Sequence, residues 1–149
     1  MIYSQERDRL RWLWCDTWRK ARAGEPLEPL EQLIARVAVD HPEYHPILEN
    51  PAESSHRDWL PTTGETNPFL HLGMHLALQE SIATDRPAGV RKIHHTLTIR
   101  VGDIHTAEHQ MMECLAEALW QAQRNGVPPN EQTYLDCLRR LCGPNAVAD

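Results

Sequence analysis

Apolar residues recur at every third or fourth position along most of the chain, which is the spacing of one buried face of an α-helix. Six stretches show this pattern, and they span approximately residues 4–24, 28–39, 68–83, 88–101, 103–125 and 130–143. Strands would show apolar and polar residues in strict alternation, and no stretch does so convincingly. The pattern therefore predicts an all-α fold, a bundle of about six helices.

The segments between these stretches are rich in residues that end helices. Two prolines within residues 41–49 permit only short helical turns there. Residues 50–66 are mostly Pro, Ser, Thr, Asp, Glu and Gly, so we expect a long surface loop with Trp59 and Leu60 packed back onto the core. The last residues, 144–149, are expected to form a frayed tail. A length of 149 residues suits one helical domain over residues 1–149.

Charge and composition narrow the classes of partner. A net charge of −6 argues against binding to a nucleic-acid backbone, which selects basic surfaces. No apolar run is long enough to span a membrane, and the charged N-terminus does not resemble a signal peptide, so we expect a cytoplasmic protein. The four cysteines form no Cys-x-x-Cys pair, and in the cytoplasm they are expected to be buried free thiols: Cys15, Cys114, Cys137 and Cys142.

The helix beginning at Pro68 carries the first candidate chemistry. Asn67 is a preferred N-cap, and proline suits the first helical position. His71 and His75 lie one turn apart on one face of this helix, as two ligands of one metal ion do. Because the helix is apolar on nearly every side, we expect it to be buried with both imidazoles inside the molecule.

The fifth stretch carries a second set of candidate ligands. His105, His109 and Glu113 follow each other at four-residue intervals and drift only about 80° around the helix axis. We expect this set to share a site with the pair on the central helix. Imidazoles and carboxylates suit divalent Zn, Fe, Ni or Mn. The complete set of expected metal ligands is His71, His75, His105, His109, Glu113, His45 and Glu49.

Two other interpretations stay open at this stage. The histidines and carboxylates can form a buried hydrogen-bond network without metal, in a protein that docks a partner protein or a second copy of itself. Alternatively, residues 105–109 match the H-x-x-E-H motif of inverted zinc peptidases, with Glu108 as the general base of a small metal-dependent hydrolase. A peptidase of that type needs a much longer chain, so the sequence does not decide whether the protein is an enzyme.

Several motifs together resemble an uncharacterised bacterial family, the domain-of-unknown-function family 1841. The resemblance extends from about Asp16 to Arg140 and rests on residues 16–20, 41–45, 64–71, 85–89, 113–115 and 120–124. It implies a small bacterial protein of the cytoplasm that forms a domain by itself. It implies no reaction, substrate or ligands, so the metal hypothesis depends on spacing and burial alone.

Overall fold

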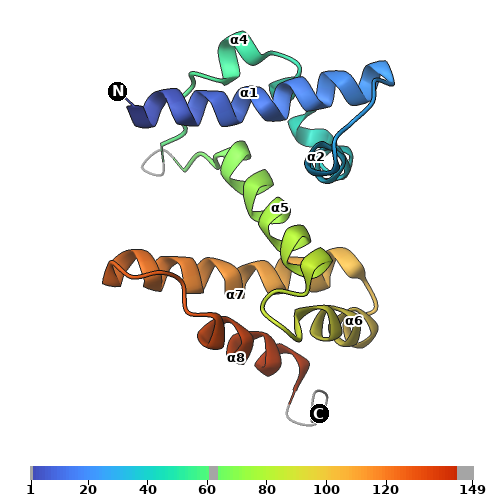
Figure 1. The fold of residues 1–149 in the computed structure, drawn as a ribbon, viewed down its shortest axis with the longest axis vertical. Coiled ribbons are helices and arrows are strands. Elements are labelled where there is room, and N and C mark those ends of the chain that lie inside the picture. The colour runs from blue at the N-terminus through green and yellow to red at the C-terminus, as the bar shows by residue number, and fades with distance from the viewer. Residues whose placement is uncertain (1, 61–63, 144–149) are drawn as a thin grey trace. The chain divides into compact units, whose positions relative to one another are not determined.

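The computed structural model describes residues 2–60 and 64–143, and every regular element within them is helical. Figure 1 shows the α-helices α1 (Ile2–Ala23), α2 (Pro29–Val39), α3 (His45–Leu48), α4 (Pro51–Ser54), α5 (Pro68–Thr84), α6 (Val90–Val101), α7 (Ile104–Asn125) and α8 (Glu131–Cys142). A 3-10 helix, η1 (Pro42–Tyr44), precedes α3. The all-α prediction is confirmed. The described residues form eight α-helices instead of about six, because α3 and α4 add two single turns.

Side-chain caps begin the helices where the sequence predicts them. The Asn67 Oδ1 atom accepts hydrogen bonds from the backbone N–H groups of Phe69 and Leu70, at 3.0 and 3.3 Å. Asp103 caps α7 by accepting from the Thr106 N–H, and Asn130 caps α8 in the same way. These bonds satisfy N–H groups that the first turn of a helix leaves without partners.

The chain divides into two compact units, Met1–Leu76 and Ala77–Asp149, and the boundary falls inside α5. The expectation of one domain stays a prediction. Within the described residues, no helix is both long and apolar enough to cross a lipid bilayer.

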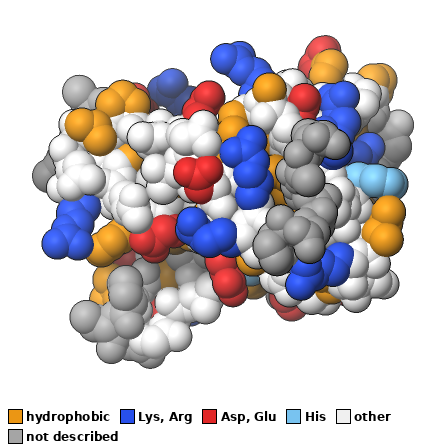
Figure 2. Space-filling model, turned by 90° about the horizontal axis from the view of Figure 1, so that it is seen from below, with side chains coloured by type: hydrophobic (Ala, Val, Ile, Leu, Met, Phe, Trp, Pro, Cys, Tyr) orange, Lys and Arg blue, Asp and Glu red, His pale blue; other side chains and the backbone are white. Residues whose placement is uncertain are grey.

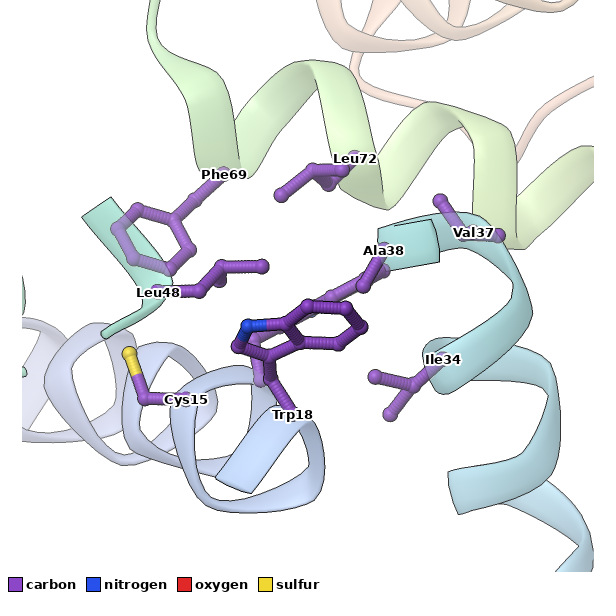
Figure 3. Close-up of a cluster of buried hydrophobic side chains, with 9 residues drawn as sticks. Cys15, Trp18, Ile34, Val37, Ala38, Leu48, Phe69 and Leu72 are labelled. Atoms are coloured by element: carbon purple, nitrogen blue, oxygen red, sulfur yellow. The ribbon is translucent and has the colours of Figure 1, made fainter. Parts of the chain in front are cut away.

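The first unit packs α1, α2, α3 and the start of α5 around Trp18 (Figure 3). The Trp18 indole lies among Ile34 and Ala38 of α2 and Leu48 of α3, while Leu72 joins them from α5. Ile34, Ala38, Leu48 and Leu72 are each at most 1% exposed. This packing brings the C-terminal end of α2 and the first turns of α5 into one core.

The predicted loop over residues 50–66 contains α4 and is partly fixed to α1. The buried Arg11 guanidinium donates to the backbone carbonyls of Ser55 and Arg57, at 3.3 and 2.7 Å. It also lies 5.1 Å from the Trp59 ring and 5.2 Å from the Phe69 ring. Trp59 is half-buried against Phe69, as expected, whereas Leu60 is 52% exposed. Residues 61–63 of this loop and the expected tail, residues 144–149, lie outside the described residues.

The second unit packs α6, α7 and α8 against one another. Its core is formed by apolar side chains of these helices, including Ile93, Leu97, Met111 and Leu138, each at most 1% exposed. The left-handed conformation of Gly126, φ 64°, ends α7 and turns the chain toward α8.

The prediction of four free thiols is wrong for two cysteines, because Cys114 of α7 and Cys137 of α8 form a disulfide. The turn at Gly126 brings the two helices together and places the two Cα atoms 5.7 Å apart, which is within disulfide range. Cys15 and Cys142 are free and buried, as expected.

Charged side chains of both signs are interspersed over the face drawn in Figure 2. Lysine and arginine side chains lie there beside aspartate and glutamate, with apolar side chains between them. Mixed charge of this kind is ordinary for a protein surface. The absence of a nucleic-acid partner stays a prediction.

Candidate metal centre

The centre of the candidate site is the histidine pair on α5. The cap at Asn67 and the proline at the first helical position start the helix in the register that places His71 and His75 on one face. Their Nε2 atoms are 3.1 Å apart, and their ring centroids are 4.8 Å apart. His75 is buried at 5% exposure and His71 is half-buried. The two imidazoles therefore lie side by side on α5, with their Nε2 atoms close together.

The third imidazole is that of His41, which lies two residues beyond the end of α2. Its ring lies edge-on to the His75 ring at 4.3 Å and to the His71 ring at 5.4 Å, measured between centroids. Its Nδ1 atom is 2.7 Å from the carbonyl oxygen of Val37, one turn back in α2. A carbonyl accepts only, so Nδ1 carries a proton in this contact, and in the neutral ring Nε2 keeps its lone pair. Metal-binding histidines are commonly held in this way by a carbonyl behind the ring.

The three histidines each offer one nitrogen, and these nitrogens all lie within 4.8 Å of one another. An ion with nitrogen bonds of about 2.1 Å requires its ligand atoms to be roughly 3.0 to 3.4 Å apart, for octahedral and tetrahedral geometry. The 3.1 Å separation between His71 and His75 already meets this requirement. A shift of the His41 ring by about 1.4 to 1.8 Å or less closes the remaining gap between 4.8 Å and the required separation.

The aromatic side chain of Tyr44 packs against the cluster. The Tyr44 ring stacks on that of His41 at 6.0 Å and meets that of His71 edge-on at 5.9 Å. Burial raises the pKa of the Tyr44 phenol, and the nearby Glu43 carboxylate adds to this effect. The phenol is therefore neutral at physiological pH and retains its proton for hydrogen bonding.

A pocket of about 480 Å³ adjoins the cluster. The His71 side chain belongs to both, since it lines the pocket and takes part in the cluster. The other described residues that line it come from the end of the 50–66 loop and from α5: Trp59, Glu65, Thr66, Asn67, Leu70 and Met74.

His45 and Glu49, two of the expected ligands, make other contacts in the first unit. The His45 Nε2 atom is 2.7 Å from the Ala38 carbonyl, and the His45 ring stacks on Trp18 at 4.2 Å. Glu49 accepts a hydrogen bond from the Trp18 indole at 3.0 Å and pairs with Arg22 at 3.5 Å. Both side chains therefore help to hold α3 against α1.

The other expected ligands lie on α7, in the second unit. His105, His109 and Glu113 are exposed there, and the His109 Nδ1 atom is 2.7 Å from the His105 carbonyl. The structure does not bring these three together with His71 and His75 into one described cluster. A site that joins both sets stays a prediction.

Glu108, the candidate base of the H-x-x-E-H motif, is buried in the second unit. One carboxylate oxygen is 2.9 Å from His94 Nε2, and the other accepts a hydrogen bond from Gln79 at 3.0 Å. Burial alone would raise the pKa of Glu108, but the hydrogen bonds from His94 and Gln79 together outweigh it and lower the pKa. A carboxylate held in its charged form in this way is suited to fixing the packing of α5, α6 and α7.

Sequence reasoning missed His41, although a weak signal was present. The last carbonyl groups of a helix have no partner within it, and a histidine just beyond the end can reach one of them. His41 stands four residues after Val37 and before a proline, which is a position suited to such a bond. Its approach to α5, 30 residues later, depends on tertiary packing that the local pattern does not encode.

The fold and the cluster define an all-α protein with three imidazoles gathered at the end of α2 and on α5. The chain belongs to the family described as "Domain of unknown function (DUF1841)", whose family model matches residues 6–140. No curated protein and no solved structure matches the chain.

Proposed function

We propose that this protein binds a divalent transition-metal ion through His41, His71 and His75. The observation that carries the proposal is the convergence of three imidazole nitrogens within 4.8 Å, with His41 oriented by a backbone carbonyl. Two of these residues, His71 and His75, were expected from spacing, and His41 is added to them.

The chemistry of the donor set favours metals that accept neutral nitrogen ligands. Imidazole suits Zn, Fe and Ni, whereas Mn prefers sites rich in carboxylates. Zinc is therefore the first ion to test, and iron and nickel follow.

A metal-free network is the second candidate, and one distance supports it. The 3.1 Å between the Nε2 atoms of His71 and His75 also fits an N–H···N hydrogen bond, in which one ring donates and the other accepts. In that case the histidines fix the packing of α2 against α5, and the function lies in an interaction with another protein.

Equilibrium dialysis separates these candidates. Protein without a His-tag is stripped with chelator and dialysed against Zn²⁺, Fe²⁺ or Ni²⁺, and the bound metal is measured by elemental analysis. The proposal predicts one ion per chain in the parent. It predicts little or none in His41→Ala and in the His71→Ala/His75→Ala double variant.

The chain offers a matched control in its second His-x-x-x-His pair. The His105→Ala/His109→Ala variant loses the same number of imidazoles with the same spacing, and it should retain the metal. Equal occupancy in the parent and the His71→Ala/His75→Ala variant, or loss of metal only in the α7 variant, would overturn the proposal.

A further inference from the structure

Three protein ligands leave the coordination shell of a divalent metal ion incomplete. Structural zinc sites are closed by four protein ligands, whereas catalytic sites have three and hold water or substrate at the next position. In the described part of the chain, the cluster consists of His41, His71 and His75. An ion bound there therefore keeps at least one coordination position for an exchangeable ligand.

The pocket beside His71 has the size that such a ligand needs. Its volume of about 480 Å³ lies within the range of small-molecule sites, roughly 300 to 1,000 Å³. Because His71 belongs to both the pocket and the cluster, a molecule in the pocket lies against one of the proposed ligands of the ion. Trp59, which forms one wall, is held by the Arg11 guanidinium at 5.1 Å, so this wall is fixed to α1.

The lining residues indicate what chemistry the pocket accepts. Trp59, Leu70 and Met74 present apolar surface to the apolar part of a ligand. The Asn67 Oδ1 atom is engaged as the α5 cap, which leaves the amide N–H₂ group as the donor that Asn67 can offer. Glu65, the acidic residue among the described lining residues, pairs with Arg57 at 3.8 Å, so these residues offer no unpaired charge to a charged ligand.

We infer that the pocket beside His71 binds a small, uncharged and partly apolar molecule whose carbonyl oxygen coordinates the metal ion. Esters and amides belong to this class. The inference rests on the proposed metal site. It extends that proposal because it makes the ion accessible and reactive, not merely structural, since an ion with an open position can polarise a carbonyl group.

Cobalt substitution makes the open position visible, because the visible spectrum of protein-bound Co²⁺ changes when a new ligand enters. The Co²⁺-loaded protein is titrated with acetohydroxamic acid and benzohydroxamic acid, which are uncharged in solution. Each binds a metal ion through its carbonyl oxygen and its N–O oxygen, whose proton passes to the solvent. Both should shift the spectrum in a saturable manner. Benzohydroxamic acid should bind at least about tenfold more tightly, because its ring adds apolar area that Trp59, Leu70 and Met74 cover.

A pocket-filling variant locates the binding. Leu70 is 66% exposed, so Leu70→Trp fits on the surface of α5 while occupying the pocket. This variant should weaken the binding of benzohydroxamic acid by about tenfold or more. It should leave the Co²⁺ spectrum recorded without the acid unchanged. Leu10→Trp is the matched control, because Leu10 of α1 is 61% exposed and does not line the pocket, and it should bind like the parent.

The outcomes distinguish the two proposals. Failure of the parent to bind Co²⁺ overturns the metal site and the inference with it. Binding of Co²⁺ with a spectrum that neither acid changes overturns the inference alone. The same holds if the acids remove cobalt from the protein, if the two acids bind equally, or if Leu70→Trp and Leu10→Trp behave alike.

Discussion

Replacement of His41 by alanine separates the metal-binding role of this residue from its role in packing. His41 is 7% exposed and donates to the Val37 carbonyl at 2.7 Å, so its removal costs stability even without metal. Loss of one buried hydrogen-bonding group costs about 1 to 3 kcal/mol. This cost should appear in the presence of chelator, where no ion contributes.

Bound zinc should make a second, separate contribution to the free energy of unfolding. An ion that binds only the folded protein stabilises it by about 2.7 kcal/mol when its free concentration is 100 times the dissociation constant. For a chain of this size, that corresponds to a rise in Tm of roughly 5 to 11 °C. The parent should show this rise, and His41→Ala should show little of it at the same zinc concentration.

His45→Ala is the matched control for this experiment. The His45 Nε2 atom is 2.7 Å from a backbone carbonyl of the same helix, α2, but His45 does not belong to the three-histidine cluster. The variant should lose a similar amount of stability in chelator and keep the full zinc response. The reasoning is refuted if the difference in Tm between parent and His41→Ala is the same with zinc and with chelator.

Three further predictions concern the second unit. Glu108→Gln should lower the free energy of unfolding by about 1 to 2 kcal/mol at pH 7, because the hydrogen bond from His94 holds the carboxylate charged. Since the pKa of Glu108 is lowered on folding, this stabilisation is complete above the ordinary value of 4.5 and fades as the pH falls below it, so urea titrations at pH 7 and pH 3.5 should show the difference narrowing. Reduction of the disulfide between Cys114 and Cys137, 23 residues apart, should cost about 3 kcal/mol in the same assay, and no change on reduction would contradict this contribution. Asp103→Ala should cost about 1 kcal/mol by removing the α7 cap, whereas Asp103→Asn should largely retain it.

Most of the helical architecture could be predicted from the sequence because its signals are local. Asn67, Asp103 and Asn130 start helices through short side-chain bonds to backbone groups two or three residues away. The apolar spacing between such caps and the glycines that end the helices is equally local. The single turns α3 and α4 lie in proline-rich segments, where short pieces of helix are harder to tell from turns.

The candidate site was predictable only in the part that one helix encodes. His71 and His75 are neighbours because of helical geometry, so spacing alone finds them. His41 joins them through the packing of α2 and α5 around Trp18, which no local pattern contains. His45 was preferred in the sequence because Glu49 stands four residues later, but the two side chains bind other partners.

The disulfide was also missed for a reason of tertiary structure. Cys114 and Cys137 are placed nearly symmetrically about the turn at Gly126, which is the position that two facing residues of a helical hairpin occupy. Their symmetry about a glycine turn was the available signal. The disulfide was not predicted because the chain was expected to be cytoplasmic, and disulfides are rare in a reducing compartment.

Anomalous diffraction tests the central claim most directly. Crystals grown with a stoichiometric amount of Zn²⁺ are measured on both sides of the zinc absorption edge. We expect a single anomalous peak at about 2.1 Å from one ring nitrogen each of His41, His71 and His75. Zinc located at His105 and His109 instead, or a histidine cluster without an anomalous peak, would contradict the account.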